Sequence, residues 1–244
     1  MSEEVFEAEK GLGVITNGMG TNDIDNDVEI EQLKSSEMSG ASGAKLRSLK
    51  TARVQSPSSI ITYKQCPRKY YYSYIEVLPR KQSIHTLRGK IVHSVLEDFF
   101  QLPLMQANDY RERLQHHILN LFSNHWKKHQ EAFKKLDTSE QDVEHYREDS
   151  MLMLISWLNN FMGKIDSEMR SGLKFIDAFR KHRPLTEHEL VSESLGLHGF
   201  VDAIEVLDGK TRLMDYKTSR KFDISDEYRL QLALYALLYK AKHG

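Results

Sequence analysis

Apolar residues at three- and four-residue intervals mark the middle of the chain as helical. Between about residues 109 and 182 the sequence is rich in helix-forming residues, and its apolar positions fall on one stripe of each helix. The clearest stripe consists of Leu114, Ile118, Leu121 and Phe122. This period predicts a helical insertion over about 109–182.

Shorter helices are expected on both sides of this insertion. Ser56 followed by Pro57 is typical of a first helical turn, because serine caps free amide groups and proline lacks an amide hydrogen. A second helix is indicated by the stripe of Val92, Val95, Leu96 and Phe99, and a last amphipathic helix runs from about Ser225 to Lys242.

From Glu187 the pattern changes to alternating and β-branched residues interrupted by glycines, which predicts strands. The pair Asp208-Gly209 between two such runs favours a two-residue hairpin turn. The turn fixes a register in which opposed residues are Glu205 with Arg212, Ile204 with Leu213, and Asp202 with Asp215.

The predicted opposition of Asp202 and Asp215 is unfavourable, because two carboxylates about 5 Å apart repel each other. A divalent cation held by oxygen ligands would offset this repulsion. Lys217 lies two residues beyond Asp215, so both side chains are expected on one face of the strand. The alternative is that Lys217 only forms a salt bridge at a sheet edge.

The charge distribution separates residues 1–54 from the rest. Of the first 33 residues nine are acidic and one is a lysine, so the other residues carry a formal charge of about +7. The polar composition of residues 1–54 predicts a disordered acidic tail, and the basic remainder suits a polyanionic partner. With no apolar stretch of about 20 residues and no signal peptide, a cytoplasmic protein without a membrane partner is expected.

Five ordered segments resemble the RecB-like branch of the PD-(D/E)XK nuclease superfamily, which includes nuclease domains of the RecB type and CRISPR-associated exonucleases. They are Cys66-Pro67-Arg68, Gly89–His93, Gly199-Phe200-Val201-Asp202, Asp215-Tyr216-Lys217-Thr218-Ser219 and Gln231–Tyr235. The resemblance implies one α/β (α+β) domain over residues 55–244, with a restriction-endonuclease-like mixed central sheet flanked by helices.

The resemblance also implies roles for individual residues. Mg²⁺ or Mn²⁺ would be held by Asp202, Asp215, the backbone carbonyl of Tyr216 and additionally His93. Lys217 would orient the attacking water or stabilise the transition state, and Gln231 and Tyr235 would lie near the scissile nucleotide. Core packing is an equally good interpretation of Tyr235. Three acidic residues of the first strand are left outside the site: Glu187, Glu189 and Glu193.

Tyrosines alternate with basic residues between positions 68 and 80. Arg68, Lys69 and Arg80 are predicted to contact DNA, and at least two of the interleaved tyrosines are expected in the core. Many members of the RecB-like branch hold a four-iron cluster with four cysteines. Here Cys66 is the single cysteine, so no cluster is expected, either because it was lost or because the chain is a truncated piece; Cys66 is predicted to be a buried small residue.

The resulting prediction is a metal-dependent exonuclease that favours single-stranded DNA and acts in repair, recombination or CRISPR adaptation, together with protein partners of those pathways. Two alternatives stay open. The chain could be a non-catalytic nucleic-acid-binding subunit that retains the nuclease fold, or it could be a nuclease that acts on RNA.

Overall fold

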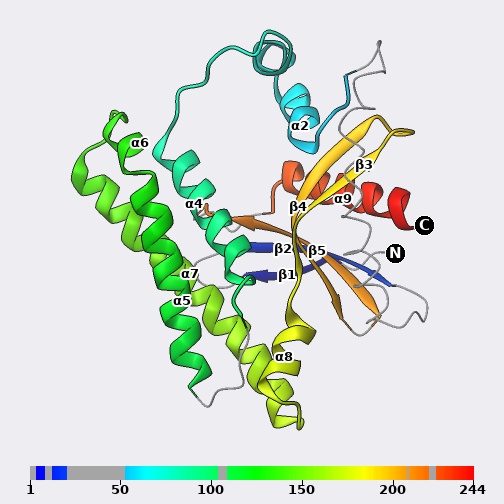
Figure 1. Ribbon diagram of the computed structural model, residues 1–244. Helices are drawn as coiled ribbons and strands as arrows, with labels where there is room; N and C mark the ends of the chain where they lie inside the picture. Colours follow the sequence, from blue (N-terminus) through cyan, green and yellow to red (C-terminus); the bar gives the residue numbers. More distant parts are fainter. Residues whose placement is uncertain (1–3, 9–12, 21–52, 104–108, 208, 220–223) are drawn as a thin grey trace.

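The computed structural model describes residues 4–8, 13–20, 53–103, 109–207, 209–219 and 224–244, and it shows a five-stranded sheet flanked by helices (Figure 1). The strands are β1 (Glu4–Ala8), β2 (Gly13–Gly20), β3 (Leu185–Ser192), β4 (Leu197–Leu207) and β5 (Lys210–Lys217), in the order β1-β2-β5-β4-β3. The helices are α2 (Pro57–Gln65), α3 (Pro67–Tyr70), the π-helix η2 (Tyr71–Ile75), α4 (Ile84–Phe99), α5 (Tyr110–Lys128), α6 (Gln130–Lys134), α7 (Glu140–Arg170), α8 (Phe175–His182) and α9 (Asp226–His243). This arrangement confirms the predicted fold class, including the helices of the insertion.

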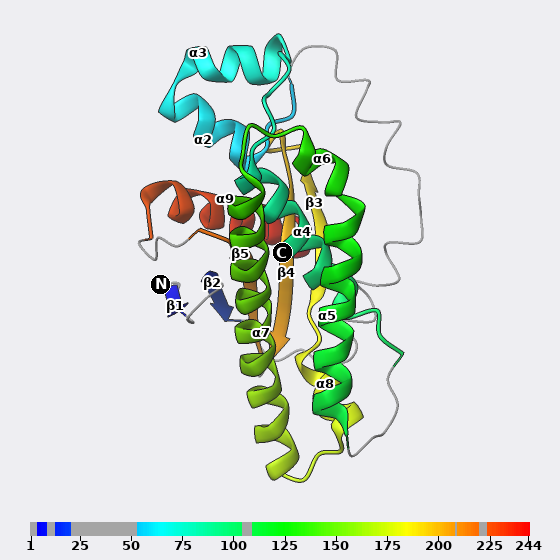
Figure 2. The same ribbon diagram turned by 90° about the vertical axis from the view of Figure 1, so that its left-hand side faces the viewer.

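The two faces of the sheet are covered by different helices. On one face α4, α5, α7 and α8 pack around Phe99, and Ala203, Met214 and Tyr216 join this core from the sheet. Figure 2 shows α5 and α7 side by side across that face. On the other face α9 packs Leu232, Tyr235 and Leu238 against the strands, and α2 adds Ile60.

Local signals explain where the elements begin. The Ser56 hydroxyl accepts a hydrogen bond from the amide of Ser59 at 3.2 Å, so α2 starts with the predicted cap. The stripe of α4 is buried as predicted, since Val92, Val95, Leu96 and Phe99 are each at most 1% exposed. The β4–β5 hairpin has the predicted register from Leu207–Lys210 to Ile204–Leu213, and Gly209 takes a φ of 69° in its turn.

The sheet differs from the prediction in two respects. All described strand pairs are antiparallel, and a parallel contact occurs only as an isolated bridge between Gln55 and Leu197, so the predicted mixed sheet is wrong in this detail for the described residues. The predicted disorder does not hold for residues 4–8 and 13–20, which form β1 and β2; β2 pairs with β5, and β1 pairs with β2. A physical reason is that the second edge of β5 offers backbone groups that an added strand can satisfy. Most of the predicted tail lies outside the described residues.

The segment around Cys66 is more exposed than predicted. Cys66 is exposed, and its Sγ accepts a hydrogen bond from the Lys69 amide at the start of α3. None of the tyrosines of α3 and η2 is buried, so the predictions of a buried Cys66 and of core tyrosines are wrong. The reason is that neither element packs any residue into one of the two cores. Within the described residues, no helix has the length and apolar character needed to cross a membrane.

Glu205 anchors a buried ion cluster that joins the sheet to the helical layer. Its side chain is 4% exposed, and its carboxylate lies 3.1 Å from Arg212 Nη1, 3.6 Å from Lys164 Nζ and 3.8 Å from His182 Nδ1. Burial raises the pKa of Glu205, but these three partners outweigh burial and lower the pKa to about 2. Because the pKa is depressed in the folded state, its stabilising contribution is complete above the ordinary pKa of 4.5 and is lost as the pH falls through about 2.

We expect Glu205→Gln to lower the free energy of unfolding by about 3 kcal/mol at pH 7, because it removes the charge of a buried carboxylate whose partners lower its pKa in the folded state. Urea unfolding at pH 7 and pH 3 measures this loss. The difference between wild type and variant should shrink to about half at pH 3. Equal unfolding free energies at pH 7 would show that the cluster does not stabilise the fold.

Candidate metal centre

Three potential metal ligands converge from α4, β3 and β4. They are His93, Glu187 and Asp202, and one ligating atom from each lies within 4.8 Å of the other two. All three side chains are partly buried, so the atoms face a region that is shielded from bulk water but still reachable. An imidazole with two carboxylates is a donor set that suits Mg²⁺ or Mn²⁺.

A break in the strand pairing places Asp202 in this cluster. The β4–β5 ladder ends at Ala203–Met214, so the predicted direct pairing of Asp202 with Asp215 is wrong. Instead, Asp202 Oδ2 accepts a hydrogen bond of 2.6 Å from the amide of Tyr216. The Asp202 carboxylate thus accepts a hydrogen bond that a backbone carbonyl of the neighbouring strand accepts in regular pairing. Its second oxygen, Oδ1, faces His93.

His93 is oriented by a backbone carbonyl. Its Nε2 lies 2.9 Å from the Tyr216 carbonyl oxygen, which can only accept, so Nε2 carries the hydrogen of this bond. Nδ1 then faces Asp202 Oδ1 at 3.3 Å. Such a bond from the remote ring nitrogen to a carbonyl is the usual support of a metal-binding histidine. Burial lowers the pKa of His93, but Asp202 and Asp215 outweigh burial and raise it, so positive charge is favoured between these groups.

Glu187 was left outside the predicted site, and the structure brings it in. Residues on either side of it pair regularly with β4, as Thr186 with Ala203 and His188 with Val201, so Glu187 and Asp202 occupy the irregular position between them. Glu187 has a φ of 48°, a conformation that costs about 1–3 kcal/mol for a residue with a side chain. Burial, followed by the nearby charges of Asp202 and Glu97, raises the pKa of Glu187. A cation at this position would relieve that repulsion.

Asp215 lies at the buried side of the cluster. Its side chain is 7% exposed, and its Oδ2 forms an ion pair with Lys217. Gln231 Nε2 donates to Asp215 Oδ1 at 2.9 Å, while Gln231 Oε1 accepts from Lys217 Nζ at 3.0 Å. Burial raises the pKa of Asp215 and the charge of Lys217 opposes this change. Lys217, Gln231 and Asp215 therefore form one hydrogen-bonded unit beside the three-residue cluster.

Helix α9 delivers Gln231 and Tyr235 from the same face, as their spacing predicts. Gln231 Nε2 also lies 3.2 Å from the Tyr235 hydroxyl, and the Tyr235 side chain packs in the core beneath α9. The Tyr235 ring packs so closely on β4 that position 199 has no space for a side chain. A Cβ on Gly199 would lie 3.0 Å from Tyr235 Cε1 and 3.3 Å from Pro57 Cδ. Gly199 thus lets α9 and α2 approach the strand that carries Asp202. Tyr235 both packs in the core and contacts Gln231 of the site.

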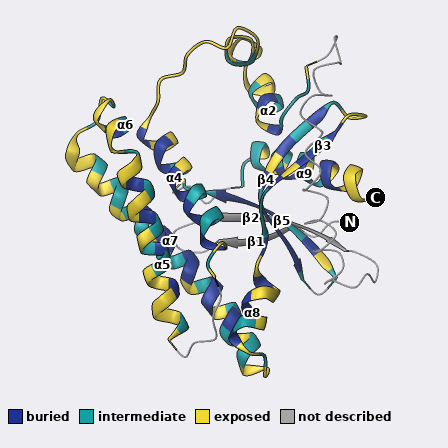
Figure 3. Ribbon diagram, viewed as in Figure 1, coloured by how far each residue is buried: buried dark blue, intermediate teal, exposed yellow. Residues whose placement is uncertain are grey.

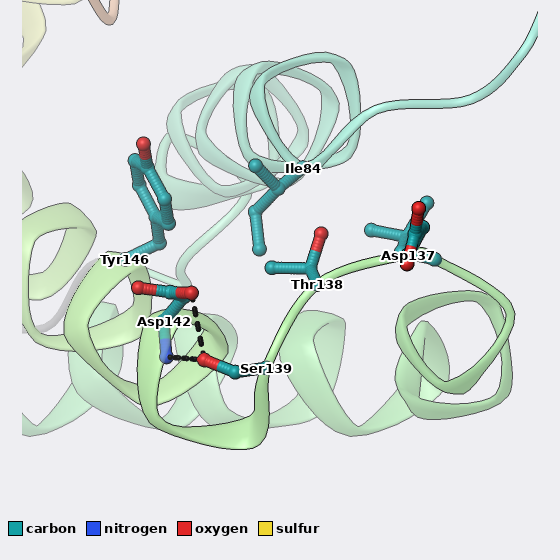
Figure 4. A pocket seen from close by; sticks show the side chains of 7 residues that line it. Ile84, Asp137, Thr138, Ser139, Asp142 and Tyr146 are labelled. Carbon is teal, nitrogen blue, oxygen red and sulfur yellow. Dashed lines mark hydrogen bonds between the residues drawn. The ribbon is translucent and has the colours of Figure 1, made fainter.

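The residues predicted to contact DNA and the pocket in Figure 4 are separate from the cluster residues. Arg68 and Lys69 lie in α3 and Arg80 lies in the coil after η2, and all three are exposed. Figure 2 shows α3 at one end of the molecule. The pocket in Figure 4 is bordered by Ile84 at the start of α4 and by Asp137–Asp142, where Ser139 caps α7. None of the cluster residues lines it, so this pocket is not the candidate metal site.

Comparison with known proteins identifies the family to which most of the chain is similar. Residues 55–244 match the family model described as the PD-(D/E)XK nuclease superfamily. No curated protein and no solved structure matches the chain. The matched segment contains His93, Glu187, Asp202, Asp215 and Lys217.

Proposed function

The chain belongs to the PD-(D/E)XK nuclease superfamily, whose members are metal-dependent phosphodiester hydrolases, and on this premise we propose that it cleaves DNA. We further propose that it belongs to the RecB-like branch, acts as an exonuclease that favours single-stranded DNA, and serves repair, recombination or CRISPR adaptation with protein partners. The observation that carries the proposal is the convergence of His93, Glu187 and Asp202 beside the Asp215–Lys217 pair.

The residues at this site divide into metal ligands and groups that act on the substrate. His93, Glu187 and Asp202 would hold Mg²⁺ or Mn²⁺. Asp215 and the Tyr216 carbonyl, which lie beside these three residues, are proposed as further ligands. When bound, the cation neutralises phosphate oxygens and lowers the pKa of a coordinated water. Lys217 adds an ammonium group where negative charge develops on the phosphate.

Gln231 and the ring of Tyr228 hold the Lys217 ammonium in place. Gln231 Oε1 accepts one hydrogen bond from Nζ, and Nζ lies 4.9 Å from the centroid of the Tyr228 ring. A fixed ammonium needs little reorganisation when charge develops, which makes its contribution to catalysis larger. Gln231 also contacts Asp215, so it would position the lysine relative to the metal ligands.

The proposed function is tested by incubating the full chain with end-labelled single- and double-stranded DNA, with Mg²⁺ or Mn²⁺, in the presence of increasing unlabelled RNA. Cleavage that RNA does not inhibit at equal concentration supports a DNA nuclease, and a product ladder from one labelled end identifies exonuclease action and its polarity. Inhibition of DNA cleavage by RNA at equal or lower concentration, together with cleavage of end-labelled RNA in a parallel reaction, would replace DNA as the proposed substrate. Binding without cleavage would identify a non-catalytic subunit.

Glu187→Gln is expected to weaken Mn²⁺ binding at least about tenfold, because the amide keeps the size of the side chain but removes a negative charge from the cluster. Calorimetric titration of the DNA-free protein with Mn²⁺ measures this change. Glu189→Gln is the matched control, since Glu189 is exposed on the same strand two residues away. Equal Mn²⁺ affinities of wild type and Glu187→Gln would exclude Glu187 from the metal site.

A further inference from the structure

Residues 63–81 form an arm, made of the end of α2, α3, η2 and the following coil, that exposes an unusual number of large side chains. Figure 3 shows much of this segment as exposed, at one end of the molecule. Within the described chain, most of the exposed large hydrophobic residues belong to it: Tyr63, Tyr71, Tyr72, Ile75, Val77 and Leu78. An exposed apolar surface of this kind marks a binding site more often than a solvated surface.

The arm is also strongly basic. Its charged side chains are Lys64, Arg68, Lys69, Glu76, Arg80 and Lys81, which give a formal charge of +4. Arginines flank the rings, since Arg68 lies 5.6 Å from the centroid of Tyr72 and Arg80 lies 5.2 Å from that of Tyr74. Lysine is depleted in the interfaces between proteins, so this mixture of cations and rings fits a polyanion better than a protein partner.

The tyrosines divide into an inner and an outer pair. Tyr70 and Tyr74 are half-buried, and Arg53 lies over both rings, at 5.8 Å and 4.7 Å from their centroids. Tyr71 and Tyr72 point outward with 47% and 39% of their surface exposed. The inner pair therefore stabilises the arm, whereas the outer pair is available to a ligand.

We infer that the outer tyrosines form a stacking platform for unpaired bases of a single-stranded DNA substrate, while Arg68 and Lys69 contact its phosphates. The inference rests on the proposed function, because it identifies where the substrate of that nuclease is held outside the metal centre. Stacking on an aromatic ring needs a free base face and tolerates any sequence. Paired bases in a duplex do not expose such faces, so the platform favours single-stranded DNA.

Binding of a fluorescein-labelled oligothymidine to the full chain in the presence of EDTA tests this inference without cleavage. Tyr71→Leu with Tyr72→Leu removes the rings but keeps apolar side chains, and it should weaken binding at least about fivefold for each unstacked base. Tyr71→Phe with Tyr72→Phe keeps the rings and should bind like the wild type. Leu152→Ala, at an exposed apolar position of α7 remote in sequence, should also have no effect.

Two further measurements separate the contributions. Duplex DNA binding should be the same in the leucine pair and the wild type, because stacking is not used there. Arg68→Gln with Lys69→Gln should flatten the dependence of log affinity on log salt by about 0.7 for each phosphate contact that is lost. These variants test the electrostatic part of the arm independently of the rings.

Unchanged oligothymidine binding in the leucine pair would overturn the inference, as would an equal loss of binding in the phenylalanine pair. Both results are independent of catalysis. If wild-type protein binds through the rings but does not cleave DNA, only the proposed nuclease activity fails. If it cleaves DNA while the leucine pair binds normally, only the platform fails.

Discussion

Asp202→Asn should reduce metal-dependent DNA cleavage at least about a thousandfold, because it removes a charged candidate ligand of the metal ion. One carboxylate oxygen of Asp202 accepts a hydrogen bond from the Tyr216 amide of β5, and the other faces His93. The asparagine oxygen can still accept the hydrogen bond from the Tyr216 amide, so the β4–β5 hairpin should keep its geometry. What the substitution removes is the negative charge that faces His93 and Glu187. Cleavage rates of single-stranded DNA and Mn²⁺ titration, measured on the same preparation, should both show the loss.

Glu189→Gln is again the matched control for this experiment, because it removes a carboxylate from an exposed position of the neighbouring strand. Its cleavage rate should equal that of the wild type. An unfolding transition like that of the wild type would show that Asp202→Asn is folded. Wild-type cleavage by a folded Asp202→Asn protein would remove Asp202 from the active site.

Lys217→Ala should slow cleavage by about 10²–10³-fold without weakening Mn²⁺ binding. The reason is that Lys217 contributes an ammonium to the site but no ligand atom, and its removal deprives buried Asp215 of a competing cation. Single-turnover cleavage at saturating Mn²⁺ measures the effect on the chemical step. Lys240→Ala, at an exposed position of α9, provides a lysine control.

β5 lies between β2 and β4, so the predicted position of Lys217 at a sheet edge is wrong. The remaining alternative, that Lys217 only forms a salt bridge with Asp215, makes a different prediction. In that case Lys217→Ala would lower the free energy of unfolding but leave the cleavage rate per folded molecule unchanged. Urea unfolding together with single-turnover rates therefore distinguishes the two roles. If Lys217 acts in catalysis, Lys217→Ala lowers the single-turnover cleavage rate under all conditions in which the variant is folded.

Much of this arrangement is predictable from the sequence because the signals are local. The Asp208-Gly209 turn fixes the hairpin register as far as Ala203 and Met214. The four-residue spacing of Gln231 and Tyr235 places both on the face of α9 that meets Asp215. Turn chemistry and helical period determine these features, and neither depends on distant parts of the chain.

The features that the sequence does not predict depend on contacts between distant segments. Asp202 is not part of the regular β4–β5 pairing, because its carboxylate accepts the hydrogen bond from the Tyr216 amide. The order of residue types along the chain does not reveal this side-chain hydrogen bond. Glu187 joins the site only through the pairing of β3 with β4 and through its positive φ. At least two of the tyrosines of α3 and η2 are expected in the core from the sequence, whereas none is buried, because no other element of the described chain covers them.

The most direct test of the metal centre is the cleavage of labelled single-stranded DNA by the wild-type chain as Mn²⁺ or Mg²⁺ is added and then removed with EDTA, with Asp215→Ala in parallel. We expect cleavage to appear with the cation, to stop with EDTA, and to be absent from Asp215→Ala although that variant still binds DNA. Intact DNA under every cation, or equal cleavage by Asp215→Ala, would contradict a metal-dependent nuclease centre at these residues.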